Sequence, residues 1–209
     1  MKLFILPLLL LPCAAHAQGG NWPDRQECQA TLNKLASDPH SAAFGWALTY
    51  GKPSACGAEG GVTMARVLRK DIRRIADVGF LDAFVLQASA NRHPAIFDAA
   101  LATARDRTVP TAIRVGAIQI ALGQHDARYL IPRNLDAPAR DPRAERICAF
   151  DMALELGFQS EQPLPGDYRA RLLREMQSLV AESGAPIAVR RSAYCVVYIL
   201  TVVEAPDAS

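Results

Sequence analysis

Four cysteines lie beyond the first 17 residues, and they are the side chains whose chemistry the sequence constrains most: Cys28, Cys56, Cys148 and Cys195. An even number of cysteines in an exported chain favours two disulfides, and no CxxC pair suggests a redox site. Three pairings are open. We favour Cys28–Cys56 and Cys148–Cys195, because each pair lies within one half of the chain; free buried thiols are the alternative.

The other residue types that carry catalysis or bind metals form no recognisable motif. Beyond the first 17 residues three histidines, His40, His93 and His125, each lie beside a turn, and none is at metal-ligand spacing from another histidine or a cysteine. HExxH, GxSxG and SxxK are absent, and the glycine-rich "GAEGG" at 57–61 lacks the lysine of a P-loop. We therefore expect capping or solvated histidines, a flexible turn at 57–61, and no catalytic residue, metal or cofactor.

The segment "ARVLRKDIRRI" carries basic side chains along one face of a predicted helix. They recur at i, i+3, i+4 and i+7, with one more alongside: Arg66, Arg69, Lys70, Arg73 and Arg74. This basic stripe is a candidate anion-binding surface for an acidic protein, a sulfated or phosphorylated polymer, or an anionic lipid surface. A face that only solubilises the helix is the simpler interpretation.

The N-terminal residues have the composition of a secretory signal peptide. Lys2 precedes the apolar run "LFILPLLLLP", and the small residues Ala15 and Ala17 offer a cleavage site. The run is too short to span a bilayer as a helix. We expect cleavage after Ala17, a periplasmic or secreted location, and no membrane-spanning segment. A lipoprotein modified at Cys13 is the alternative.

The remaining residues are enough for one domain with its own core. Half of the chain is apolar, and its formal net charge is +2. A charge so close to zero gives no electrostatic argument for nucleic acid as a partner.

Apolar residues recur with helical periodicity throughout, and no segment alternates convincingly with period two. "VTMARVLRKDIRRIA" (62–76) predicts one helix with Val67, Leu68, Ile72 and Ile75 facing inward. Two further stretches, 80–88 and 96–104, repeat apolar residues at i, i+1, i+4, i+5 and i+8. Shorter helices are predicted at 22–36, where Pro23 and Asp24 are placed to start a helix, and at 40–50, followed by a loop over 51–61. The chain is therefore predicted to be all-α.

One pattern occurs three times: "PTAIRVGAIQIAL" from 110, "PRAERICAFDMAL" from 142 and "PIAVRRSAYCVVY" from 186. In each copy an arginine follows the proline by four residues, and an alanine follows that arginine by three: Arg114 and Ala117, Arg146 and Ala149, Arg190 and Ala193. Proline can start a helix, and small residues let helices approach closely. Arginine can lay its methylenes along the packed surface and place its guanidinium near a loop carbonyl or carboxylate. We interpret these six residues as repeat-stacking positions.

The pattern resembles the bacterial form of the HEAT-repeat family, whose second helix reads proline, x, x, valine, arginine, x, x, alanine. The resemblance covers residues 61–205 and implies stacked helical pairs that form a short α-α superhelix. Residues 18–60 would then be an N-terminal helical hairpin cap, and 206–209 a tail. The family's aspartate, six residues before the arginine, is missing here, and Asp106 and Asp141 are the nearby candidates to replace it.

A fold of this kind says little about activity, so the functional expectation is general. We expect a non-catalytic protein-binding or scaffold module of the cell envelope that uses its concave face. An enzyme or small-molecule sensor with a pocket between repeats is the alternative, and a module of a larger envelope assembly is a third possibility. The apolar "CVVYILTVV" (195–203) is either a buried last helix or an exposed docking surface, and we favour burial.

Overall fold

The computed structural model describes residues 23–75, 77–125 and 167–203. Within these ranges the chain forms eight α-helices and no β-strand, so the predicted all-α class is confirmed. The helices are α1 (Arg25–Leu35), α2 (Ala42–Thr49), α3 (Gly57–Lys70), α4 (Val78–Ala90), α5 (Pro94–Arg105), α6 (Thr111–His125), α8 (Tyr168–Ala181) and α9 (Ile187–Tyr198). Three shorter turns accompany them, at η1 (Pro53–Ala55), η2 (Ile72–Arg74) and η3 (Ile199–Val203).

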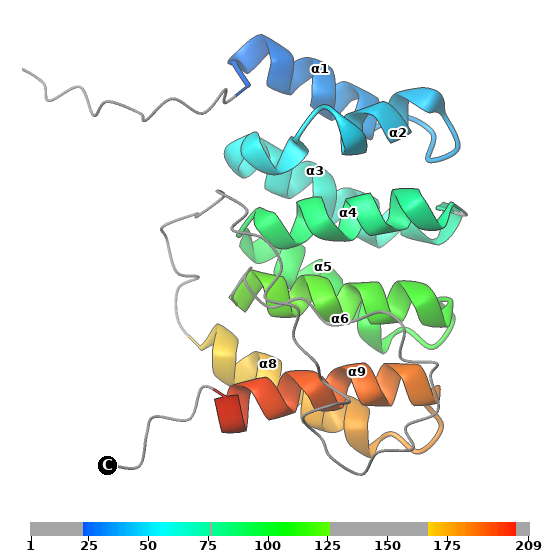
Figure 1. The fold of residues 1–209 in the computed structure, drawn as a ribbon, viewed down its shortest axis with the longest axis vertical. Helices are drawn as coiled ribbons and strands as arrows, with labels where there is room; N and C mark the ends of the chain where they lie inside the picture. Colours follow the sequence, from blue (N-terminus) through cyan, green and yellow to red (C-terminus); the bar gives the residue numbers. More distant parts are fainter. Residues whose placement is uncertain (1–22, 76, 126–166, 204–209) are drawn as a thin grey trace, which may run out of the picture.

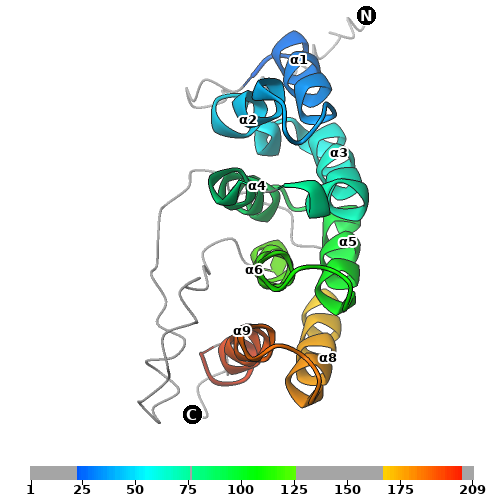
Figure 2. The ribbon, with the colours of Figure 1, turned by 90° about the vertical axis from the view of Figure 1, so that its right-hand side faces the viewer.

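The helices are stacked in two layers (Figures 1 and 2). Helices α1, α3, α5 and α8 follow an arc that we call the outer layer, and α2, α4, α6 and α9 lie on its inner side as the inner layer. Neighbours within a layer pack together, as α3 does on α5, α4 on α6 and α6 on α9. Helices α1 and α2, α5 and α6, and α8 and α9 also pair across the layers. This arrangement is consistent with a short superhelix of helical pairs.

Four helices begin directly after a residue whose side chain caps the helix N-terminus. Asp24 caps α1 in a reciprocal capping box with Glu27, so the prediction that a helix starts here is confirmed. The side chains of Ser41 and Asp77 accept backbone N–H groups at the starts of α2 and α4. His93 caps α5, where its Nδ1 accepts the Ala95 N–H at 3.1 Å.

The core lies between the two layers and follows the predicted apolar positions. In α4 and α5 the repeated apolar residues are buried, with Phe84 and Phe97 fully enclosed, and only Phe80 is partly exposed. Helix α6 is buried on every side from Ile113 to Gln124. In the C-terminal segment Cys195, Val196, Ile199 and Leu200 are buried, which confirms burial as the favoured interpretation there, although Val202 is exposed.

Two expectations about residues 51–76 are wrong. The "GAEGG" segment is no flexible turn but the start of α3. Two of its glycines are required because the backbone there passes too close to its neighbours for a side chain. A Cβ at Gly60 would lie 2.3 Å from the Pro53 carbonyl, and one at Gly61 would lie 2.4 Å from the His93 ring. The helix predicted over 62–76 ends at Lys70, and a 3-10 turn follows over Ile72–Arg74.

That break in the helix still buries the predicted inward residues. Val67 and Leu68 face the core from α3, and Ile72 and Ile75 reach the same core from the turn. Since the chain must turn toward the start of α4, a single continuous helix would carry the last two residues past the core. The apolar positions were thus predicted correctly, and the shape of the backbone was not.

Candidate functional site

The basic stripe does not form one continuous surface on a helix. Arg66, Arg69 and Lys70 lie on α3, whereas Arg73 and Arg74 lie on η2. Most of these side chains are used to connect helices: Arg69 donates to the Ala95 carbonyl at 3.4 Å, Arg73 pairs with Asp106, and Arg74 pairs with Asp38 at 3.0 Å. Arg66 and Lys70 are both exposed, and no partner is recorded for them within the described residues. The stripe therefore acts mainly as a set of links between helices, and Arg66 is the exposed cation that faces a groove.

Ion pairs of the same kind continue along the outer layer. Helices α5 and α8 are joined by pairs between Arg171 and Asp98, at 2.6 Å, and between Arg105 and Glu175. Hydrogen bonds from the Thr108 side chain and backbone, with nearby Arg73 and Arg114, hold the pKa of Asp106 below its usual value. The backbone N–H of His40, aided by Arg74, likewise lowers the pKa of Asp38.

The two arginines predicted as repeat-stacking residues on α6 and α9 lie on adjacent helices, but their surroundings differ. Arg114 is 2% exposed, and its Nε donates to the Ala104 carbonyl at 2.8 Å near the end of α5. Its Nη2 lies 3.9 Å from Glu182, which follows α8. This is the carbonyl and carboxylate environment that the repeat pattern predicts. Arg190 is half-buried, and its Nε has no hydrogen-bond partner.

The remaining members of the repeat pattern are partly described. Ala117 and Ala193 are buried on α6 and α9, as close helix packing requires. Arg146, Ala149 and Cys148 lie outside the described residues, as does Asp141. Asp106 pairs with Arg73 of the preceding helical pair, so it does not take the role of the family's aspartate in a direct pair with Arg114.

Buried amides tie the inner layer to the turn between α4 and α5. The Gln124 Nε2 donates to the carbonyls of Ala88 and Asn91, at 2.7 and 2.8 Å, and its Oε1 accepts the His93 N–H at 2.8 Å. Gln124 is fully buried, so these three bonds satisfy all but one lone pair of its amide.

The same network reaches the start of α3 and its disulfide. Asn91 donates to the carbonyls of Ser54 and Gly57, at 3.0 and 2.9 Å. Between these two residues lies Cys56, which forms a disulfide with Cys28 of α1, as predicted. Cys195 is fully buried on α9, and its predicted partner lies outside the described residues, so the second bridge stays a prediction.

An aromatic pair is exposed on α2 at one end of the inner layer. Trp46 is 41% exposed and Tyr50 is 69% exposed, with their ring centroids 6.4 Å apart. The Lys34 Nζ lies 3.3 Å from the centroid of the Trp46 ring, a cation–π contact that orients the indole. This pair was not predicted from the sequence; the signal that could have revealed it was an aromatic i, i+4 spacing in a chain with few aromatic residues.

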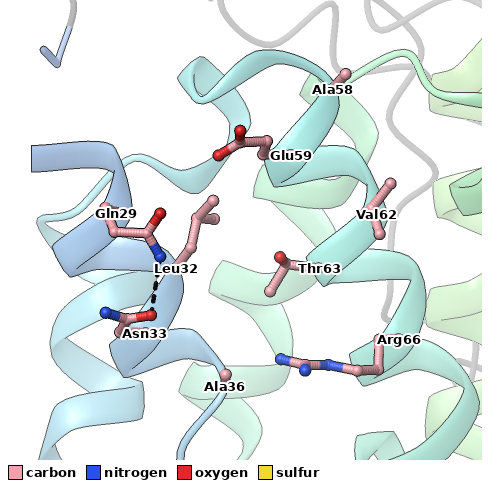
Figure 3. A pocket seen from close by; sticks show the side chains of 9 residues that line it. All are labelled: Gln29, Leu32, Asn33, Ala36, Ala58, Glu59, Val62, Thr63 and Arg66. Atoms are coloured by element: carbon pink, nitrogen blue, oxygen red, sulfur yellow. Dashed lines mark hydrogen bonds between the residues drawn. The ribbon is translucent and has the colours of Figure 1, made fainter. Parts of the chain in front are cut away.

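An open groove of about 460 Å³ runs between α1 and α3 (Figure 3). Each helix lines it with side chains at i, i+3, i+4 and i+7: Gln29, Leu32, Asn33 and Ala36 from α1, and Glu59, Val62, Thr63 and Arg66 from α3, with Ala58 beside them. Glu59 and Arg66 mark opposite ends, and both extend toward α1. The matched spacing in two segments was visible in the sequence, but that they face each other was not.

The described residues offer no arrangement suited to catalysis by a metal. In that part of the chain no group of three or more histidine, cysteine, aspartate or glutamate side chains is placed to hold an ion. Within the same ranges no helix has the length and apolar character needed to cross a lipid bilayer.

The fold and these surfaces define a class of protein, a two-layered stack of helices with exposed polar and aromatic patches at its N-terminal pair. No protein-family model matches the chain, and no curated protein or solved structure is significantly similar to it.

Proposed function

We propose that this chain is an exported, non-catalytic helical-repeat protein of the HEAT-like kind that binds another protein as a scaffold in the cell envelope. The observation that supports this best is the exposed Trp46–Tyr50 pair on α2. Tryptophan and tyrosine are enriched at the residues that dominate binding energy in protein interfaces. Lys34 fixes the indole before binding, which lowers the entropy lost on association.

The binding surface we propose differs from a concave face used along its whole length. Helix α6, in the middle of the inner layer, is buried on every side, whereas exposed aromatic residues lie at the ends of that layer. We place the main contact at Trp46 and Tyr50. The Cys28–Cys56 disulfide is compatible with the oxidising compartment that an exported protein would occupy.

A site-specific photocrosslinker tests this proposal in intact cells. Tyr50 is replaced by p-benzoylphenylalanine, and the control carries the same group at Ala102, an exposed residue of the outer layer. We expect one dominant protein adduct at Tyr50 that is reduced by Trp46→Ala and absent at Ala102. No adduct at Tyr50, or the same adducts at both positions, would refute the proposal.

Among the described residues, the groove between α1 and α3 is an observation that favours the alternative, an enzyme or small-molecule sensor. A thermal-shift screen of metals, nucleotides and metabolites distinguishes the two proposals. A reproducible rise of several degrees with one compound, removed by Arg66→Gln, would favour the sensor.

The proposal of an anionic polymer or lipid surface as a partner has lost much of its support. Three of the five basic side chains of the stripe already hold carbonyl or carboxylate groups of the same chain. Replacing Arg66, Arg69 and Arg73 together by glutamine, followed by heparin chromatography and liposome binding, tests what remains. Unchanged retention at low salt would remove this proposal.

A further inference from the structure

Charged and apolar side chains follow one another in a defined order along the groove between α1 and α3. Glu59 supplies a carboxylate at the end near the disulfide, and Arg66 supplies a guanidinium at the other end (Figure 3). Seven residues of helix separate them, which corresponds to about 10 Å along the axis. Leu32 and Val62 lie between these charges, and Val62 is 57% exposed although it is a large apolar residue.

The walls of the groove also offer amide groups to a bound main chain. Gln29 and Asn33 of α1 hydrogen-bond to each other at 3.0 Å, through the Gln29 Nε2 and the Asn33 Oδ1. This bond leaves the side-chain carbonyl of Gln29 and the side-chain amide NH2 of Asn33 available, so the two side chains together retain acceptors and donors. A peptide in the polyproline II conformation has no internal hydrogen bonds, so both kinds of backbone group are open to such contacts.

The charges at the two ends are not neutralised by the rest of the described structure. No ion pair is recorded there for Glu59 or Arg66, in contrast to Arg73 and Arg74 of the same basic stripe. An occupant with charges of the opposite sign would therefore find both groups available. A chain in the polyproline II conformation has three residues per turn and advances about 3.1 Å per residue, so two side chains three residues apart lie on one face about 9 Å apart, which matches the separation of Glu59 and Arg66.

We propose that this groove binds a segment of a partner protein in the polyproline II conformation, in which a basic and an acidic side chain are three residues apart, with small apolar residues between them. The basic side chain lies at Glu59, the acidic one at Arg66, and an apolar one covers Val62. The amides of Gln29 and Asn33 bind the segment's backbone. This inference rests on the proposed role in protein binding, but it uses a surface other than Trp46 and Tyr50.

Two peptides of the same composition test the spacing of the charges. The first is acetyl-TKAVDT-amide, with lysine and aspartate three residues apart, and the second is acetyl-TKDAVT-amide, with these charges adjacent. Both are titrated into the full chain while backbone and side-chain amide signals are followed by NMR. We expect the first peptide to bind about five-fold more tightly and to shift the signals of Gln29, Asn33, Val62 and Thr63.

Two charge reversals on α3 then test the role of Arg66. Arg66→Glu should weaken binding of the first peptide about five-fold, whereas Lys70→Glu, the same change one turn away and outside the groove, should alter it less than about two-fold. The Arg66→Glu variant should in turn prefer acetyl-TKAVKT-amide. Equal effects of the two substitutions, equal binding of the first two peptides, or shifts confined to other residues would overturn the inference.

The result is separable from the crosslinking experiment. A Tyr50 adduct without peptide binding at the groove would leave the proposed function standing and remove this inference. Peptide binding at the groove without a Tyr50 adduct would retain the groove and remove the aromatic pair as the main contact.

Discussion

Replacing Arg114 by methionine should lower the free energy of unfolding by about 2 to 3 kcal/mol. The substitution keeps an unbranched apolar side chain in the space that the arginine methylenes occupy, so it isolates the guanidinium. That group is 2% exposed and donates from Nε to the Ala104 carbonyl at 2.8 Å. Carbonyls in the last turn of a helix have no intrahelical partner, so this contact satisfies a group that would otherwise be buried and unpaired.

The expected magnitude follows from the two contacts of the guanidinium. A hydrogen bond from a charged donor contributes about 1.5 to 3 kcal/mol; the cost of leaving the buried carbonyl unpaired is the same loss counted from the other side, so the two are not added. The Glu182 carboxylate, at 3.9 Å from Nη2, adds an attraction that is largely offset by desolvation of the arginine. Glu182 also keeps a second partner, Arg107 at 2.6 Å, so it is not left without a cation in the variant.

Arg190 provides the matched control, because it occupies the same position of the repeat pattern on α9. Its Nε is buried without a hydrogen-bond partner, so Arg190→Met should change stability by less than about 1 kcal/mol. Urea denaturation of both variants gives the comparison. Equal losses in the two variants, or no loss in Arg114→Met, would show that the guanidinium contacts do not stabilise the stack.

Three further predictions concern the disulfide, the buried amides and one carboxyl group. Cys28→Ser should lower the free energy of unfolding by about 3 to 4 kcal/mol, because the bridge joins residues 28 positions apart; an unchanged denaturation midpoint would contradict this. Gln124→Leu should lower the free energy of unfolding by about 2 to 4 kcal/mol, because three hydrogen bonds are lost. Gln119 lies on the same helix, and its Oε1 has no hydrogen-bond partner, so Gln119→Leu should lower it by less than about 1 kcal/mol. Thr108→Val should raise the pKa of Asp106, measured by NMR titration, because its hydroxyl stabilises the charged form. Since that pKa is depressed in the folded state, the charged Asp106 stabilises the fold at neutral pH. This contribution is lost as the pH falls through the folded pKa. The free energy of unfolding of Thr108→Val should therefore fall less on acidification than that of the wild type.

The all-α class and the core positions could be predicted from the sequence because they depend on local periodicity. The spacing at 80–88 and 96–104 fixed which faces of α4 and α5 are buried, and Asp24 marked the start of α1. The break after Lys70 could not be predicted in this way, because Ile72 continues the helical apolar pattern even though the backbone leaves the helix. The helix ends there because the chain must turn toward α4, and that constraint comes from the tertiary structure and not from the local sequence.

The candidate surfaces were harder to predict because each combines residues from separate segments. The basic stripe appeared continuous in the sequence. Whether its side chains are free to bind an anion depended on Asp38, Ala95 and Asp106, which lie elsewhere in the chain and pair with three of them. Predicting the groove would have required knowing that the periodic faces of α1 and α3 lie opposite each other. The disulfide prediction gave part of that information, since Cys28 and Cys56 bring the starts of those faces together.

The location of the disulfide has a consequence for both candidate surfaces. It joins α1 to the residue before α3, at the end of the groove where Glu59 lies, and Asn91 holds the carbonyls on either side of that cysteine. Reduction would therefore free α1 from α3 at this end, while α1 would remain packed on α2. The Trp46–Lys34 contact lies within that remaining pair. Peptide binding at the groove should thus weaken on reduction, whereas crosslinking at Tyr50 should persist, and the opposite order would show that α1 is held against α3 without the bridge.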